Sequence, residues 1–63
     1  MKIGIDCRLW DETGVGRYIR NLVRQLQYID NKNEYVLFVL SKDYEALKFE
    51  IKNPKWTIEE ADI

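Results

Sequence analysis

The residues best suited to chemistry lie at one turn near the start of the chain. Gly14 and Gly16, separated by Val15, stand where a polar loop gives way to an amphipathic segment, and a short apolar strand ending at Asp6 precedes that loop. A glycine turn that opens a helix at the carboxyl end of a strand directs free backbone N–H groups outward. Such groups bind anions, phosphates above all. From spacing alone, the alternative that the glycines only permit a sharp turn is equally good.

Charged residues flank this turn. Arg17 belongs to the first helical turn, where a cation opposes the helix dipole unless an anion binds nearby. Arg8 follows the first strand and can face the same crevice. Asp6 ends that strand, and it contacts a ligand, orients Arg8 or accepts hydrogen bonds from loop N–H groups. The candidate substrate- or phosphate-binding residues are therefore six: Asp6, Arg8, Gly14, Val15, Gly16 and Arg17. If Gly16 faces a ligand, a valine there should abolish activity with little loss of fold.

The surrounding sequence excludes several stricter motifs. A dinucleotide fingerprint needs a third glycine where Ile19 stands and an acidic residue where Ser41 stands. Cys7 has no adjacent base, which favours a buried, inert thiol. Trp10 is either a lid over the helix or a stacking surface for a sugar. With one cysteine and no histidine, the chain predicts no metal site, no internal disulfide and no cofactor.

Composition narrows the class of protein. The 63 residues support one small domain, and 46% hydrophobic content argues against disorder. A net charge of −1 gives no overall basic field, so we expect no nucleic-acid partner. The longest apolar run, Tyr35 to Leu40, is too short for a transmembrane segment. The absence of a signal-peptide pattern and the cysteine usage favour the cytoplasm.

The elements expected to position these residues form an α/β unit. Lys2 to Asp6 is predicted as a strand, Cys7 to Thr13 as a loop, and Gly14 to Ile29 as a helix with Thr13 as its N-cap. The helix has one broad apolar face, comprising Val15, Tyr18, Ile19, Leu22, Val23, Leu26 and Ile29, and a solvated face with Arg17, Arg20 and Arg24.

The second half of the chain predicts further strands. Tyr35 to Leu40 is apolar at every position, which is typical of a parallel strand covered on both faces. Ser41 to Phe49 is a short helix or turn, and Trp56 to Ile58 a third strand. The sequence therefore predicts a partial Rossmann-like βαβ unit with parallel strands plus a third strand, an incomplete domain. Either more chain covers the second sheet face, or copies of the chain associate through it.

Three blocks of the sequence resemble a known family. Ile3 to Arg8, Gly14 to Leu22 and Asn33 to Val39, in this order and with natural spacing, closely resemble the amino-terminus of group 1 (family 4) retaining glycosyltransferases of the GT-B fold. These enzymes transfer a sugar from a nucleotide-sugar donor to an acceptor. The resemblance covers about Met1 to Leu40.

The resemblance implies that residues 1–63 are an amino-terminal fragment of a Rossmann-like acceptor-side domain. The Gly14 to Gly16 turn would then border the cleft between two domains and approach donor phosphate and acceptor. Cys7 replaces the alanine common in the family. The family's donor-binding domain has no counterpart here, so we expect the fragment to be inactive alone. The alternatives are a small non-catalytic, self-associating α/β module and a phosphate-binding regulator.

Overall fold

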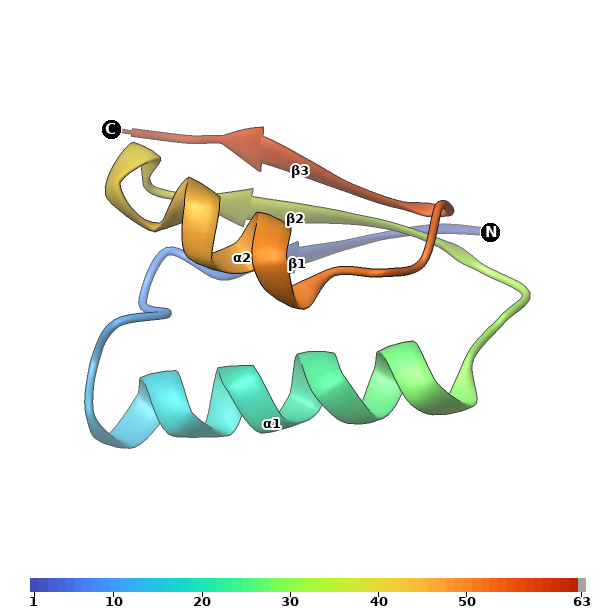
Figure 1. The fold of residues 1–63 in the computed structure, drawn as a ribbon, viewed down its shortest axis with the longest axis horizontal. Coiled ribbons are helices and arrows are strands. Elements are labelled where there is room, and N and C mark those ends of the chain that lie inside the picture. Colours follow the sequence, from blue (N-terminus) through green and yellow to red (C-terminus); the bar gives the residue numbers. More distant parts are fainter. Residues whose placement is uncertain (63) are drawn as a thin grey trace.

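A computed structural model describes residues 1–62 and shows a three-stranded parallel sheet with two α-helices (Figure 1). Along the chain these are strand β1 (Lys2–Asp6), helix α1 (Gly14–Ile29), strand β2 (Glu34–Val39), the 3-10 turn η1 (Ser41–Asp43), helix α2 (Tyr44–Glu50) and strand β3 (Trp56–Glu60). The sheet order is β1-β2-β3. The predicted α/β class, the parallel strands and the third strand are confirmed. Neither helix in residues 1–62 has the length and apolarity needed to span a membrane.

Both helices cover the same face of the sheet (Figure 1). Each crossover is expected to be right-handed, and both move the chain in the same direction across the sheet, so their helices fall on one side. Alternate residues of β2, namely Tyr35, Leu37 and Val39, point into the layer between sheet and helices and are buried. They pack with Ile19, Val23, Leu47 and Trp56 from the other elements.

The opposite sheet face has no helix over it in residues 1–62, as expected for an incomplete α/β unit whose helices cover one face. Val36 on that face is half-buried, and Phe38 is 39% exposed. Phe38 lies over Gly4 of the neighbouring strand, where a Cβ atom would come within 3.1 Å of its ring. The rest of this face is polar, with exposed side chains from Lys2, Asp6, Glu34, Thr57 and Glu59.

Helix α1 uses only half of its predicted apolar face. Ile19 and Val23 are buried against the sheet, and Leu26 packs beside them. The other half, which we call the outer stripe, consists of Val15, Tyr18, Leu22 and Ile29. Val15 is 45% exposed, Tyr18 is 67% exposed and Ile29 is 71% exposed, whereas Leu22 is half-buried.

The turn between α1 and β2 is organised by Asp30. Its carboxylate accepts hydrogen bonds from the Tyr35 hydroxyl at 2.6 Å, from Asn33 Nδ2 at 2.9 Å and from the backbone N–H groups of Lys32 and Asn33. These donors, the Tyr35 hydroxyl first, hold the pKa of the Asp30 carboxyl well below its ordinary value. The same Tyr35 ring stacks on Trp56, with ring centres 4.2 Å apart. One carboxylate thus fixes the entry of β2 and the ring that β3 packs against.

Candidate functional site

Asp6 and Arg8 form a paired unit at the carboxyl end of β1. The guanidinium donates to both carboxylate oxygens, at 3.0 and 2.9 Å, and the Arg8 backbone N–H donates to Oδ1 at 3.0 Å. These bonds lower the pKa of the Asp6 carboxyl and raise the pKa of the Arg8 guanidinium. Together with Phe38 and Ala61, the pair lines a hollow of about 240 Å³. Of the roles open to Asp6, the structure shows two, since the carboxylate pairs with the Arg8 side chain and accepts a loop N–H bond.

The first turn of α1 begins on the other side of the sheet. Thr13 occupies the N-cap position, as predicted, but within residues 1–62 its side chain makes no capping hydrogen bond. Beyond Gly14, a Cβ atom would meet nothing within 4 Å among the described residues, so the turn is open there. Val15 is 45% exposed. The side-chain position of Gly14 is therefore unobstructed, and the N–H groups of a first helical turn have no acceptor within the helix.

Gly16 is enclosed by its own chain. A Cβ atom at this position would lie 2.6 Å from the carbonyl oxygen of Trp10 and 2.9 Å from that of Leu9. No glycine in residues 1–62 has a positive φ, so backbone freedom is not what the turn requires. Glycine is needed here because the loop crosses directly over the helix. The expectation that a valine at Gly16 would leave the fold intact is therefore wrong.

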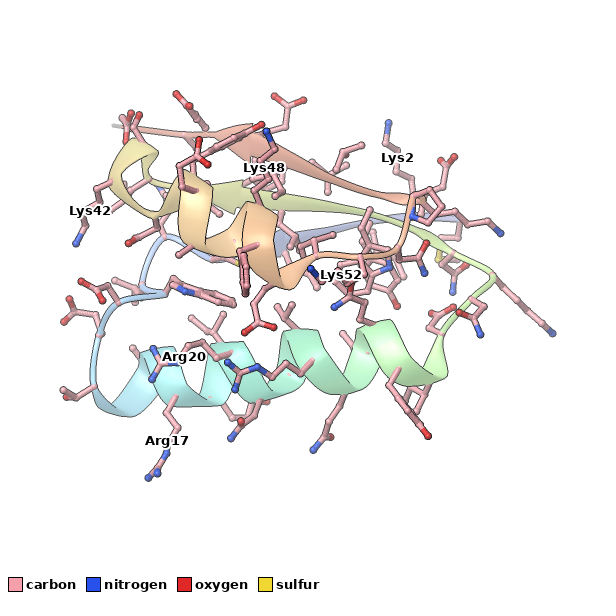
Figure 2. All side chains as sticks on the ribbon, in the orientation of Figure 1. Lys2, Arg17, Arg20, Lys42, Lys48 and Lys52 are labelled. Carbon is pink, nitrogen blue, oxygen red and sulfur yellow. The ribbon has the colours of Figure 1, made fainter. Side chains whose placement is uncertain are left out.

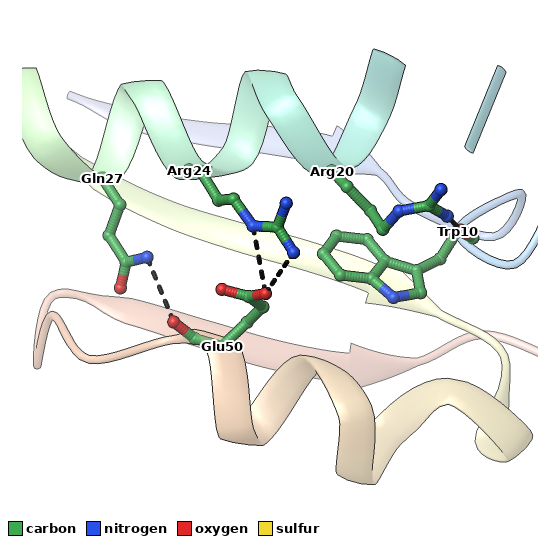
Figure 3. Close-up of polar contacts among 5 residues, drawn as sticks. All are labelled: Trp10, Arg20, Arg24, Gln27 and Glu50. Carbon is green, nitrogen blue, oxygen red and sulfur yellow. Dashed lines mark hydrogen bonds and ion pairs between the residues drawn. The ribbon is translucent and has the colours of Figure 1, made fainter. Parts of the chain in front are cut away.

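The three arginines of α1 have different environments. Arg17 points away from the sheet (Figure 2) and has no ion-pair partner within residues 1–62. Arg20 donates to the Trp10 carbonyl at 2.5 Å, and Arg24 pairs with Glu50 at 2.6 Å (Figure 3). The prediction of a solvated face is confirmed for Arg17 and Arg24, since the Arg24 side chain is 52% exposed beside Glu50, and it is wrong for half-buried Arg20. Arg20 reaches sideways to the loop, and Arg24 reaches sideways to α2.

The six candidate residues consequently fall into two groups. Asp6 shares the helix-free face with Phe38, its neighbour in the register, and holds Arg8 beside it. Gly14 to Arg17 begin the helix on the covered face. A ligand touching both groups would have to extend around the carboxyl ends of the strands.

Cys7 and Trp10 belong to the core. Cys7 is fully buried, as predicted, and burial raises the pKa of its thiol to about 11, with a further contribution from the Asp6 charge. Trp10 is only 6% exposed. Its indole covers the helix layer, and this matches the lid interpretation rather than a stacking surface for a sugar.

Sequence reasoning missed a polar cluster after β2 and β3. The Ser41 hydroxyl bonds the carboxylates of Glu60 and Asp62, and the Ser41 backbone N–H donates to Asp62 at 2.8 Å. The Ser41 hydrogen bonds lower the pKa of the Asp62 carboxyl. Polar residues at the ends of neighbouring parallel strands were the available signal. Nearby Asp43 is buried, and its Oδ2 atom has no hydrogen-bond partner in residues 1–62.

Gln27 was also missed. Its Nε2 donates to the Glu50 carbonyl at 3.2 Å (Figure 3), and its Oε1 accepts from the backbone N–H groups of Lys52 and Asn53. This one side chain satisfies three backbone groups in the segment that leaves α2. It borders a hollow of about 500 Å³ between α1 and that segment, at the end of the molecule away from the glycine turn.

Neither a search for metal-binding side chains nor the comparisons with known proteins identify a function for this site. No three His, Cys, Asp or Glu side chains in the described part of the chain are grouped to hold a metal ion. No protein-family model, curated protein or solved structure matches the chain.

Proposed function

We propose that the chain forms the acceptor-side, amino-terminal part of a retaining group 1 (family 4) glycosyltransferase, which moves a sugar from a nucleotide-sugar donor to an acceptor. The observation that carries the proposal is the open start of α1 at the carboxyl end of β1. There the space beyond Gly14 is empty of described protein atoms, and the backbone N–H groups of the first turn lack helical acceptors. The sequence blocks that resemble the family fall on β1, on this turn and on β2.

The residues divide the work in this proposal. Gly14 and Val15 present backbone N–H groups to a phosphate or an acceptor oxygen, and exposed Arg17 adds positive charge beside them. Gly16 holds the loop of Leu9 and Trp10 against the helix and so shapes the turn. The Asp6–Arg8 pair is available to a longer ligand. We place the protein in the cytoplasm, where a lone buried thiol such as Cys7 stays reduced.

The binding step can be tested on the 63-residue chain. Uridine diphosphate at millimolar concentration should shift the amide resonances of Gly14 and Val15. A Gly14→Glu variant has room for its side chain but places a carboxylate beside the anion, so the shifts should disappear. Gly14→Ala is the matched control and should bind like the original chain. Absence of shifts at these amides, or equal shifts in the glutamate variant, would contradict a phosphate-binding turn.

A turnover assay then distinguishes a transferase from a phosphate-binding regulator. The native polypeptide, purified at its natural length, is incubated with a panel of nucleotide sugars and a panel of hydroxyl-bearing acceptors, and released nucleoside diphosphate and glycosylated acceptor are measured. We expect release by that polypeptide and none by the 63-residue chain alone. Binding without release by the native polypeptide would favour the regulator.

A self-associating α/β module remains a second candidate, because the outer stripe of α1 leaves apolar side chains exposed.

A further inference from the structure

The outer edge of β1 carries unpaired backbone groups. The Cys7 N–H donates to the Phe38 carbonyl at 2.7 Å, and the Met1 carbonyl accepts from the Glu34 N–H at 2.9 Å. The backbone N–H and C=O groups of the odd-numbered residues in this strand therefore point toward β2. Because backbone groups alternate along a strand, those of Lys2, Gly4 and Asp6 point to the free edge. Such an edge is a template for pairing with another strand.

The sequence of β1 is complementary to itself. In an antiparallel pair of two β1 strands centred on Gly4, Lys2 of each copy lies opposite Asp6 of the other. All outward-facing residues then meet as hydrogen-bonded pairs, and Ile3 lies opposite Ile5 on the helix-covered face. Asp6 is able to accept the lysine, since its side chain is still 60% exposed beside Arg8. The lysine–aspartate pair forms twice in a symmetric dimer.

The outer stripe of α1 lies on the same side of the molecule. The opposite flank of this helix reaches α2, where Arg24 and Gln27 both bond to Glu50 (Figure 3). Gln27 also accepts from the backbone N–H of Asn53 in the following segment. The outer stripe therefore faces away from α2, toward the β1 side of the sheet. A two-fold axis through the paired β1 strands brings the outer stripes of both copies together above the joined sheet.

We propose that two copies of the 63-residue chain associate through β1 and the outer stripe, which makes one continuous six-stranded sheet. The partner is a second copy because the edge is complementary to itself in charge and register. A symmetric contact of this kind closes after two copies. The inference concerns the 63-residue chain and does not rest on the transferase proposal. In the longer transferase a further strand of the same sheet would pair with β1, because the first strand of a doubly wound sheet is an interior strand. The proposed contact uses the β1 edge and the outer stripe of α1 rather than the open sheet face, which is largely polar.

The other edge of the sheet is a poorer partner. Strand β3 ends in Glu59 and Glu60, and Asp62 follows, whereas the one basic residue beside the strand is Lys55. The Lys55 ammonium already donates to the Asn31 carbonyl, so a pair of β3 strands would leave an excess of carboxylates at its ends. Helix α2 also packs beside this strand rather than leaving an apolar stripe free. The comparison favours β1 as the pairing edge.

Charge exchange tests the register. Sedimentation equilibrium of the original chain should show a monomer–dimer equilibrium. Lys2→Glu places two carboxylates opposite each other, and Asp6→Lys places two lysines opposite each other, so each variant should dimerise about tenfold more weakly or worse. An equimolar mixture should recover the original dimer affinity, because every carboxylate of one variant then lies opposite a lysine of the other. Failure of the mixture to recover, with both variants folded by circular dichroism, overturns the register.

Two tyrosines on α1 provide a test that does not alter β1. Tyr18 belongs to the outer stripe and is 67% exposed, whereas Tyr28 is 87% exposed and borders the hollow near Lys52. Tyr18→Ser should weaken the dimer about tenfold, while Tyr28→Ser should leave it unchanged. A folded monomer of the original chain at all concentrations overturns the proposal. So does a dimer that resists Tyr18→Ser and is lost on Phe38→Ser, because it would use the open sheet face.

Discussion

Replacing Gly16 with alanine should destabilise the fold, although alanine is the better helix former. The added methyl group would lie 2.6 and 2.9 Å from the carbonyl oxygens of Trp10 and Leu9, and 3.0 Å from Nη1 of Arg20. Two of these contacts are with backbone, which cannot rotate away. Either the loop lifts from α1, or the hydrogen bond from Arg20 to the Trp10 carbonyl is lost.

The size of the effect follows from three contributions. Overpacking typically costs about 1–3 kcal/mol. Loss of the Arg20 hydrogen bond adds about 1 kcal/mol, and the helix propensity of alanine returns about the same amount. We therefore expect a net loss of about 1–3 kcal/mol in the free energy of unfolding. For a domain of this size, each kcal/mol lowers Tm by about 4–8 °C.

The matched control is Gly14→Ala, because a methyl group there meets nothing within 4 Å in residues 1–62. Thermal and urea unfolding should be followed by circular dichroism for both variants at one fixed protein concentration. The control should be as stable as the original chain or slightly more stable. A Gly16→Ala chain with unchanged stability would refute the packing explanation and return Gly16 to a purely ligand-facing role.

Three further predictions concern the scaffold. Asp30→Asn should lower the free energy of unfolding at pH 7 and make that free energy depend less on pH in acid. Folding lowers the pKa of the Asp30 carboxyl, so its stabilisation is present above about pH 4 and disappears as the pH falls further. Asp11→Asn, at an exposed position, should change little. Gln27→Ala should cost about 1–3 kcal/mol by leaving backbone groups unpaired, and Gln25→Ala, at an exposed position of the same helix, should be nearly neutral. Cys7 should resist alkylation in the folded chain and react once urea unfolds it.

Each of these has a clear contrary result. If Asp30→Asn and the original chain unfold at the same pH in acid, Asp30 does not contribute to the pH dependence of stability. Equal unfolding curves for the two glutamine variants would mean that Gln27 contributes nothing through its hydrogen bonds. Rapid, complete labelling of Cys7 in the native chain would contradict its burial.

The local elements of this chain could be predicted from the sequence because their signals are local. The bounds of β1 and α1 agree with the structure, since a short strand with Ile3 and Ile5 on one face, a polar loop and a helical period define them without reference to the rest. Strand β2 begins one residue earlier than predicted because the Glu34 N–H pairs with the Met1 carbonyl. That contact depends on a residue far away in the sequence.

What could not be predicted depends on distant partners. The apolarity of Val36 and Phe38 does not reveal which sheet face the helices take. The environments of Arg20 and Arg24 depend on the path of the loop and on the position of Glu50. Gly16 reads as a flexible turn residue until the Leu9 and Trp10 carbonyls are seen against it. The periodicity of a segment shows which residues share a face of a helix or strand. Which of those faces is buried depends on packing against residues far away in the sequence.

The carboxylates at the end of β3 and just beyond it limit how far a sheet built from this chain can grow. Identical strands stacked in register, as in cross-β aggregates, repeat about every 4.7–4.8 Å and would align each carboxylate of Glu59, Glu60 and Asp62 with its own copy. Like charges at that spacing repel, so this edge resists fibril growth. The balanced charges of β1 offer no such barrier, but pairing with a second copy would remove that edge from solvent. The two edges of this small sheet thus resist further strand addition in different ways. Charge repulsion acts at β3, and pairing with a second copy would cover β1.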